Sequence, residues 1–208
     1  MEEGYQAAQT NAEKLETVEM TSYDESTIRP LHSSSTAIDR ALLERVIQGY
    51  LTVPEGFTVH PKLKTNTLDK RREVLTGAAL DWATAEMVAF GSLVLEGTPV
   101  RLSGQDCPRG TFSQRHLELV DFETGDSYIP LQHLSSDQAK FEVVDSSLSE
   151  YAVMGFEFGY SVADPLTLVL WEAQFGDFAN GAQIMIDQFI AAAESKWGQP
   201  SGLVLLLP

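Results

Sequence analysis

The sequence predicts an α/β domain built on a parallel sheet and preceded by a helical N-terminal segment. Three runs carry this prediction, because each is continuously apolar rather than alternating: FEVVD (141–145), LTLVLW (166–171) and LVLLL (203–207). Strands buried on both faces have this composition, and parallel sheets are covered on both faces. The segments between the runs are long enough for the crossover helices that parallel strands require.

The N-terminal part of the chain is expected to be a polar appendage. Residues 1–18 are rich in good helix formers, which predicts an exposed helix, and residues 19–37 are rich in Ser and Thr, which predicts an irregular connector. An apolar stripe predicts a helix over 38–50, and residues 62–75 are basic and helical in character. We therefore expect the α/β domain to span 38–208, truncated at its C-terminal end.

The middle of the chain adds a helix, a short strand and a hairpin. Asp81 is a candidate N-cap and Gly97 a candidate stop for a largely apolar helix. Residues 100–103 predict a short strand. Alternation on either side of residues 123–126 predicts a β-hairpin.

Two further helices are expected around the second apolar run. Residues 149–163 are apolar almost all round, which predicts a buried helix, and Gly155 and Gly159 would permit another helix to approach closely. Residues 178–194 predict a helix with one apolar face. That face consists of Ala182, Met185, Ile186, Phe189, Ile190 and Ala193.

The composition argues against several functional classes. The 208 residues carry a net charge of −16, which argues against a nucleic-acid phosphate track and against an anionic membrane as partner. No apolar run approaches the ~20 residues of a membrane helix, and the N-terminus lacks the apolar core of a signal peptide. A single cysteine, Cys107, excludes an internal disulfide framework and a cysteine-rich zinc site. We expect a soluble, cytoplasmic protein with no nucleic-acid or membrane partner.

Polar residues cluster where two of the apolar runs pass into helices. Residues 146–150 follow the first run, and residues 174–177 follow the second. In an open parallel sheet, ligands bind outside the carboxyl ends of the strands. The sequence therefore predicts a ligand site formed by these two segments.

The residues of this site each have two interpretations. Ser147 and Glu150 have the spacing of a capping box; the alternative for Glu150 is a carboxylate beneath a ligand, exchanging a proton with a heteroaromatic ring nitrogen. Phe175 and Phe178 are either core residues or stacking surfaces for a flat ligand. Asp177 is expected to be an N-cap rather than a metal ligand, and the acids show no spacing specific to a metal.

The loop GQDCPRGTFSQRH (104–116) is rich in groups that recognise anions. It contains Gln105, Asp106, Arg109, Arg115 and His116. Arginine makes bidentate contacts to carboxylates, and histidine donates or accepts protons near neutral pH. The alternative is a surface loop whose arginines pair with some of the excess acids.

Four motifs carry a family resemblance. They are GFTVHPKL (56–63), RLSGQDCPRGTFSQRH (101–116), DSSLSEYAVMGFEFGY (145–160) and VLWEAQFGDFANGAQ (169–183). In this order they resemble the thiamine-diphosphate-dependent first component of 2-oxoglutarate dehydrogenase, and especially its actinobacterial 2-oxoglutarate decarboxylase form. The likeness covers about 38–208.

That resemblance implies a transketolase-like pyrimidine-binding domain. The family decarboxylates 2-oxoglutarate and transfers the succinyl group to lipoamide in the tricarboxylic acid cycle. Glu150 would match the catalytic glutamate that hydrogen-bonds the aminopyrimidine ring nitrogen. Phe178 would match the aromatic that stacks on the pyrimidine, with Phe175 next to it.

The resemblance also assigns the polar loop and the partners. His116 would match an active-site histidine that faces the substrate, with Arg115 binding substrate and Gln105 and Asp106 binding cofactor in the same loop. The family forms homodimers and works with a dihydrolipoyl succinyltransferase component. It holds the diphosphate and Mg²⁺ through a Gly-Asp-Gly…Asn motif in another domain, and this sequence lacks that motif.

Two alternatives to this function remain open. One is another 2-oxo acid dehydrogenase, acting on pyruvate or branched-chain acids. The other is a non-catalytic interaction module of the same fold. Since family members extend beyond both ends of this sequence, we expect a fragment that is inactive alone.

Overall fold

The computed structural model describes residues 35–208, and within it residues 38–208 form one compact unit. The exposed helix predicted over 1–18 and nearly all of the connector predicted over 19–37 lie outside the described residues. None of the helices formed by residues 35–208 is long and apolar enough to cross a membrane.

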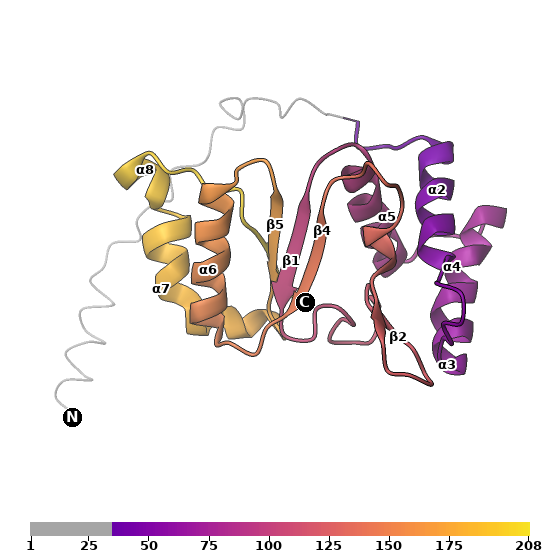
Figure 1. Cartoon of the computed structure of the whole chain (residues 1–208). Helices are drawn as coiled ribbons and strands as arrows, with labels where there is room; N and C mark the ends of the chain where they lie inside the picture. Colours follow the sequence, from indigo (N-terminus) through magenta and orange to yellow (C-terminus); the bar gives the residue numbers. More distant parts are fainter. Residues whose placement is uncertain (1–34) are drawn as a thin grey trace, which may run out of the picture. The chain divides into compact units, whose positions relative to one another are not determined.

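A four-stranded parallel sheet lies at the centre of this unit (Figure 1). Its strands are β1 (Val100–Gly104), β4 (Phe141–Asp145), β5 (Leu168–Glu172) and β6 (Val204–Leu206), in the spatial order β4-β1-β5-β6. All three pairings are parallel. The predicted parallel sheet is therefore confirmed, and the strand order, which the apolar runs left open, places β1 between β4 and β5.

The register aligns the carboxyl ends of three strands. Gly104 at the end of β1 lies opposite Asp145 of β4 and Glu172 of β5. Gly104 has a φ of +150°, and a Cβ there would lie 2.2 Å from the Glu172 carbonyl oxygen, so only glycine fits. The loops that follow β1, β4 and β5 consequently start from one row of residues.

Side chains alternate between the two faces of the sheet, and helices cover both faces (Figure 1). On β5, Leu170 packs into a core with helix α5 (Trp82–Leu95), whereas Trp171 packs on the other face against α6 (Glu150–Ala163) and α7 (Gln183–Met185). Each large apolar side chain buried in this way contributes about 1.5–3 kcal/mol.

Helix α5 begins and ends as its sequence predicts. The Asp81 carboxylate accepts a hydrogen bond of 2.7 Å from the Thr84 N–H and so caps the helix. Gly97, with a φ of +94°, follows the last turn. Gly91 in the middle of α5 allows close packing, since a Cβ there would lie 2.3 Å from Val46.

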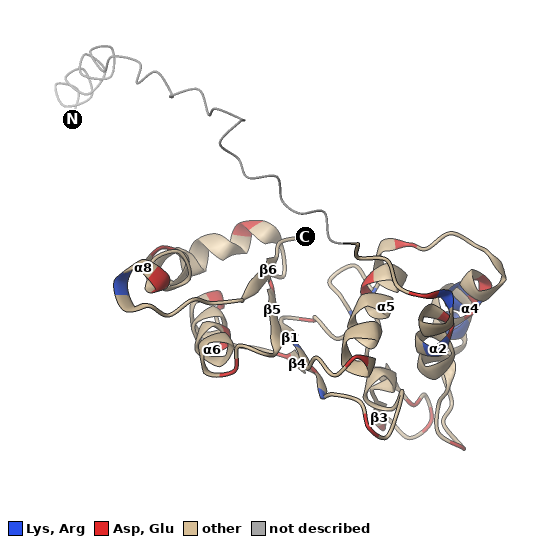
Figure 2. Ribbon diagram, turned by 90° about the horizontal axis from the view of Figure 1, so that it is seen from above, with Lys and Arg blue, Asp and Glu red and all other residues tan. Residues whose placement is uncertain are grey.

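A second helical layer packs on α5. It consists of α2 (Arg40–Leu51), α3 (Pro61–Leu63), the π-helical turn η2 (Lys64–Leu68), α4 (Asp69–Glu73) and the 3-10 turn η3 (Val74–Thr76). The helices predicted over 38–50 and 62–75 are thus confirmed. Figure 2 shows the basic residues gathered on α4 and α2.

The predicted hairpin is confirmed, although it is short. Its strands β2 (Leu119–Val120) and β3 (Ser127–Tyr128) pair antiparallel over two residues each. The Asp121 carboxylate stabilises the turn by accepting hydrogen bonds from three backbone N–H groups, those of Thr58, Glu123 and Thr124. A 3-10 turn, η4 (Pro130–Gln132), leads on to β4.

The prediction that the helix over 149–163 is buried all round is wrong. α6 buries one face, and its opposite face exposes a stripe of small and aromatic residues at helical spacing. We call this the α6 stripe; it consists of Ala152, Phe156, Gly159 and Ala163. Gly155 does permit close approach of another helix, because a Cβ there would lie 3.0 Å from Met185 of α7 in the same chain.

The helix predicted over 178–194 is broken into shorter pieces. They are the 3-10 segment η5 (Gly176–Ala182), α7, the π-helical turn η6 (Ile186–Ile190) and α8 (Ala193–Trp197). The predicted inward face holds, with Ala182, Met185 and Ala193 buried. The N-cap prediction for Asp177 is wrong, because Phe175 occupies the cap position and no side chain caps η5.

Candidate functional site

Glu150 is the first residue of α6 and is not part of a capping box. The cap is Ser149, whose hydroxyl accepts a hydrogen bond of 3.4 Å from the Ala152 N–H. The capping-box prediction for Ser147 and Glu150 is therefore wrong, because the chain leaving β4 turns into the helix two residues later than Ser147. Within residues 35–208 no hydrogen bond or ion pair involves the Glu150 carboxylate.

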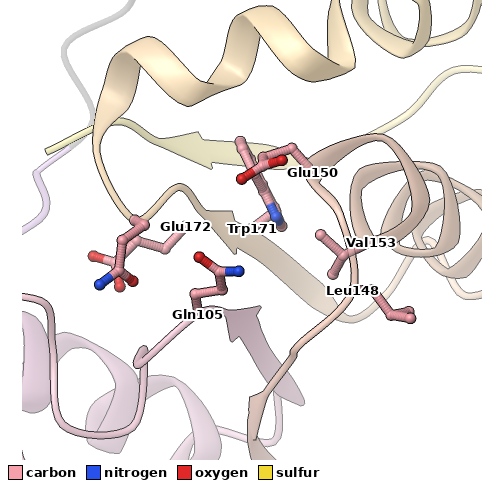
Figure 3. Close-up of a pocket in the computed structure, with 7 residues that line it drawn as sticks. Gln105, Leu148, Glu150, Val153, Trp171 and Glu172 are labelled. Carbon is pink, nitrogen blue, oxygen red and sulfur yellow. The ribbon is translucent and has the colours of Figure 1, made fainter.

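A small pocket adjoins Glu150 at the carboxyl edge of the sheet (Figure 3). It is lined by Gln105, Leu148, Glu150, Val153, Trp171, Glu172 and Gln174. The indole Nε1 of Trp171 and the amide Oε1 of Gln174 are buried, and neither has a hydrogen-bond partner within residues 35–208. Buried polar atoms are normally satisfied, so this pocket offers one donor and two acceptors to a polar ligand.

The segment η5 approaches the Glu150 side chain. A Cβ on Gly181 would lie 3.5 Å from Glu150 Oε2, so the glycine keeps the backbone close to the carboxylate. Phe175 and Phe178 sit at the start of the same segment, with ring centroids 6.2 Å apart. Both are nearly half exposed, at 44% and 45%. This exposure excludes the interpretation of these two rings as core residues and leaves their faces available to a flat ligand.

The loop after β1 is tied to the ends of β4 and β5. The Asp106 N–H donates to Asp145 Oδ1 at 2.8 Å, and Gln174 Nε2 donates to Asp106 Oδ2 at 3.1 Å. Hydrogen bonds from Arg109 and then Gln174 hold the pKa of the Asp106 carboxyl below its usual range. Asp106 therefore orients Gln174, while Gln105 lines the pocket itself.

Arg115 is buried and bound to two glutamates. Its guanidinium donates to Glu86 at 2.6 and 3.0 Å, to Glu172 Oε1 at 2.7 Å, and also to Glu172 Oε2. Burial opposes the charge on Arg115, but the hydrogen bonds to Glu172 and Glu86 outweigh it and raise the pKa of the guanidinium. Since Glu172 lines the pocket, this ion cluster forms part of the pocket's support.

His116 lies outside the pocket of Glu150. Its φ of +48° is in the left-handed region, and its Nε2 lies 2.9 Å from the Ser113 carbonyl oxygen. The Tyr50 hydroxyl donates to the His116 carbonyl oxygen at 2.7 Å. Burial, with smaller effects of the Arg71 and Arg109 charges, lowers the pKa of the imidazole despite the hydrogen bond to Ser113.

The part of the chain that matches a known family includes this whole site. The profile of the family described as "Transketolase, pyrimidine binding domain" matches residues 78–208, which is more than half of the chain. The chain belongs to this family. The sheet, the Glu150 pocket and the loop 104–116 all lie inside the matched part of the pyrimidine-binding domain.

Individual relatives are similar over most of this chain. The "Multifunctional 2-oxoglutarate metabolism enzyme" of Mycobacterium sp. (strain JLS) is 55% identical over 180 residues, covering 84% of this chain and 14% of that protein. The "2-oxoglutarate dehydrogenase E1 component" of Brucella anthropi is 55% identical over 174 residues, covering 83% of this chain and 17% of that protein. The chain thus spans less than a fifth of the length of these curated relatives.

The pyrimidine-binding domain brings some of the predicted site residues together and separates others. Glu150 and Gln105 line one pocket, Asp106 accepts a hydrogen bond from Gln174 in its wall, and Phe175 and Phe178 lie next to each other outside its lining. Arg115 and His116 follow in the loop but do not line the pocket. Within residues 35–208 no three His, Cys, Asp or Glu side chains are placed to share a metal ion.

Sequence reasoning missed several residues of this domain's site. Trp171 and Glu172 are the last residues of a buried strand. A glutamate at the end of an apolar run is a feature of the sequence that could have indicated a site residue. Glu86 has no such signal, because a single acid in a largely apolar helix does not identify its partner. Its role depends on Arg115, which is 29 residues away in the chain.

The imidazole of His116 is expected to titrate below the usual value of about 6.5. Because its neutral form is favoured in the folded domain, its contribution to stability is complete above about pH 6.5 and is lost as pH falls through the lower, folded-state pKa. A ¹H–¹⁵N NMR titration, assigned with a His116→Gln variant, measures this pKa. A midpoint at or above 6.5 would contradict the expectation.

Proposed function

We propose that this chain is the pyrimidine-binding part of a thiamine-diphosphate-dependent 2-oxoglutarate dehydrogenase. The whole enzyme would decarboxylate 2-oxoglutarate and transfer the succinyl group to lipoamide in the tricarboxylic acid cycle. The family match and the two relatives support this proposal. The observation that carries it is the Glu150 carboxylate, which begins a helix, has no bonding partner within residues 35–208 and adjoins a polar pocket.

The polar groups of the pocket match, in kind, those that the pyrimidine half of the cofactor would need. Glu150 would bond a ring nitrogen, and Trp171 Nε1 and Gln174 Oε1 are the buried donor and acceptor left for other polar atoms of the ring. The exposed face of Phe178, next to Phe175, would stack on it. Thiamine diphosphate supplies the chemistry that cleaves the bond between a 2-oxo carbon and its carboxylate, and the protein supplies orientation and electrostatics.

Glu150 would hold and return the proton on the pyrimidine nitrogen. A positioned carboxylate acting as an acid–base catalyst typically accelerates a reaction by about 10²–10⁴-fold. Its position supports this role, because the start of a helix favours negative charge. The neighbouring backbone of η5 at Gly181 limits the space around the carboxylate.

His116 would face the 2-oxo acid substrate. An imidazole with a lowered pKa is neutral at physiological pH, so it can both accept and donate a proton at the substrate. A direct contact between Arg115 and a substrate carboxylate would require release of Glu86 or Glu172. We therefore propose that Arg115 holds Glu172 in place and that His116 is the residue of this loop that recognises the substrate.

The remaining components of the enzyme would come from outside this chain. We propose that Mg²⁺ and the diphosphate bind in another domain, that a dihydrolipoyl succinyltransferase is the partner that accepts the succinyl group, and that the enzyme is cytoplasmic. The names of the two relatives support the 2-oxoglutarate chemistry.

Decarboxylation assays on the full-length protein test this function. With thiamine diphosphate and Mg²⁺ present, release of CO₂ would be measured for 2-oxoglutarate, pyruvate and a branched-chain 2-oxo acid. We expect kcat/KM to be highest for 2-oxoglutarate. A preference for pyruvate or a branched-chain acid would indicate a different 2-oxo acid dehydrogenase. No turnover of any of them would indicate a non-catalytic interaction module.

A homodimer is part of the proposal, and the α6 stripe supports it. Ala152, Phe156, Gly159 and Ala163 lie at i, i+4, i+7 and i+11 and are all exposed. Small residues beside an aromatic one allow two helices to pack closely, and Phe156 is 59% exposed. At Gly159 a Cβ would meet no atom of this chain within 4 Å, so this face is open to a partner.

Replacing Phe156 by Asp should weaken the dimer, because a charge would be buried in an apolar contact. Sedimentation velocity of the full-length protein measures the result, and we expect a shift toward monomer. Leu166→Asp is the matched control, since Leu166 is also exposed but lies off the α6 stripe, in the turn before β5. An unchanged sedimentation profile for Phe156→Asp would exclude the stripe as the dimer contact.

A further inference from the structure

The backbone of residues 114–116 is held by side chains from the second helical layer. Arg71 Nη2 of α4 donates to the Arg115 carbonyl oxygen at 2.6 Å and to the Gln114 carbonyl oxygen at 3.4 Å. The Tyr50 hydroxyl of α2 donates to the His116 carbonyl oxygen at 2.7 Å. Three successive carbonyls thus have donors on helices that precede residue 78, where the match to the family begins.

Tyr50 and Arg71 form one buried unit. The Arg71 guanidinium carbon lies 4.4 Å from the centroid of the Tyr50 ring, and the two residues are 0% and 2% exposed. Burial raises the pKa of the Tyr50 hydroxyl to about 12, so it remains a donor at physiological pH. Both donors are therefore fixed in direction before any ligand binds.

The burial of Arg71 is unfavourable in itself. Within residues 35–208 no carboxylate forms an ion pair with Arg71, and its Nη1 has no hydrogen-bond partner. A buried charge without a paired carboxylate is costly, and an apolar residue of similar volume would pack there at lower cost. Packing alone therefore does not explain an arginine at this position, whereas the two carbonyls that it holds do.

The held segment contains His116, which is one of three non-glycine residues of the loop 104–116 with a positive φ, the others being Asp106 and Ser113. His116 has a φ of +48°, which an L-residue adopts only when surrounding contacts fix it. The His116 and Arg115 N–H groups both donate to the Arg109 carbonyl oxygen, at 3.1 and 2.9 Å, and so hold the segment from the opposite side. Without a donor on its carbonyl, the backbone of His116 would relax and its Cβ would point elsewhere.

We propose that Tyr50 and Arg71 are positioning residues that hold the His116 imidazole in its working orientation. This inference rests on the proposed role of His116 toward the 2-oxo acid. It gives the second helical layer a function in the reaction: α2 and α4 set the direction of a substrate-facing group in a loop of the pyrimidine-binding domain.

A double-mutant cycle in the full-length protein tests the proposal. Tyr50→Phe removes only the hydroxyl, and we expect kcat/KM for 2-oxoglutarate to fall about three- to tenfold, the size of one hydrogen bond. The affinity for thiamine diphosphate should not change, because the Glu150 pocket is separate. On a His116→Ala background, Tyr50→Phe should change kcat/KM by less than about twofold, because the group that it positions is gone.

Arg71 provides a second, independent variant. Arg71→Met should lower kcat/KM by at least as much as Tyr50→Phe, and Arg71→Lys, which keeps one donor, should restore part of the loss. Arg40→Met is the matched control, because Arg40 lies in the same helical layer and its Nη2 also donates to a carbonyl, that of Leu75, at 2.8 Å. Tyr128→Phe is the control for loss of a tyrosine hydroxyl.

The outcomes separate this inference from the proposed function. If His116→Ala alone leaves kcat/KM unchanged, the proposed role of His116 is wrong and the positioning role is overturned with it. If His116→Ala is impaired but Tyr50→Phe is not, only the positioning role is overturned. An equal effect of Tyr50→Phe on both backgrounds would show that the hydroxyl acts on stability rather than through His116.

Discussion

Replacing Glu150 by Gln is expected to lower the rate of 2-oxoglutarate decarboxylation in the full-length enzyme by about 10²–10⁴-fold. The amide keeps the shape of the side chain but cannot take up the proton of a ring nitrogen. Folding should be affected little, since no hydrogen bond or ion pair of the Glu150 carboxylate exists within residues 35–208. Single-turnover decarboxylation and thermal unfolding of the same preparation measure the two effects.

Ser149→Ala is the matched control for this prediction. It removes the actual helix cap, whose loss typically costs about 1 kcal/mol. We expect this neighbouring variant to lose stability and to keep most of its activity, the reverse of Glu150→Gln. If Glu150→Gln instead loses stability and retains activity, Glu150 is a structural residue of the helix start.

Arg115→Met is expected to produce the largest loss of stability. Removing one partner from a buried ion cluster typically costs about 3–5 kcal/mol, because the remaining charges stay buried and unpaired. Here Glu172 and Glu86 would both lose their cation. Hydrogen–deuterium exchange of the full-length protein should show faster exchange in β5, which ends at Glu172, and in α5, which carries Glu86.

Two further variants make this second prediction specific. Arg115→Met combined with Glu172→Gln should recover part of the loss, since one unpaired charge is removed. Arg40→Met is a control for a surface pair, because Arg40 and Glu44 are exposed and such pairs contribute about 0–1 kcal/mol. If Arg115→Met is stable and only the KM for 2-oxoglutarate rises, the substrate-binding role implied by the family resemblance is correct.

The sheet could be predicted because its strands are short runs rich in apolar residues. The expectation that such runs are buried on both faces holds for β5, whose last four residues are buried, but not for β4 and β6, which are the two outer strands of the described sheet and are partly exposed. The order of the strands could not be predicted, because it depends on which crossover passes over which strand. The exposed face of α6 could not be predicted for a related reason. The α6 stripe is apolar, so the sequence of this helix shows no polar face.

The candidate site was predicted only where its chemistry is local in sequence. Glu150 follows a strand end and lines the pocket, whereas Phe175 and Phe178 follow the next strand end and are exposed; the roles of all three stay predictions. The prediction of the helix cap was wrong. The segment 146–149 contains three serines, and only the path of the backbone after β4 determines that Ser149 is the cap.

Polar contacts between residues far apart in the chain could not be predicted from the sequence. The sequence suggests either substrate binding or pairing with some of the excess acids for Arg115, but it does not indicate which acids or that the pair is buried. The burial of Arg115 follows from Glu86 and Glu172, which are 29 and 57 residues away. Tyr50 and Arg71 belong to an earlier part of the chain and gave no signal, since their targets are backbone carbonyls, which are present at every residue.

The position of β4 at the outside of the sheet affects how copies of this domain can associate. An outer strand exposes unpaired N–H and C=O groups, to which a strand of another molecule can add, and this is a common start of aggregation. β4 is flanked and interrupted by charge: Lys140 pairs with Glu142 at 2.6 Å, and Asp145 ends the strand. A second strand added there would have to desolvate these charges, which disfavours the addition of further strands to β4. The α6 stripe, by contrast, remains available for the proposed pairing of two copies of this domain.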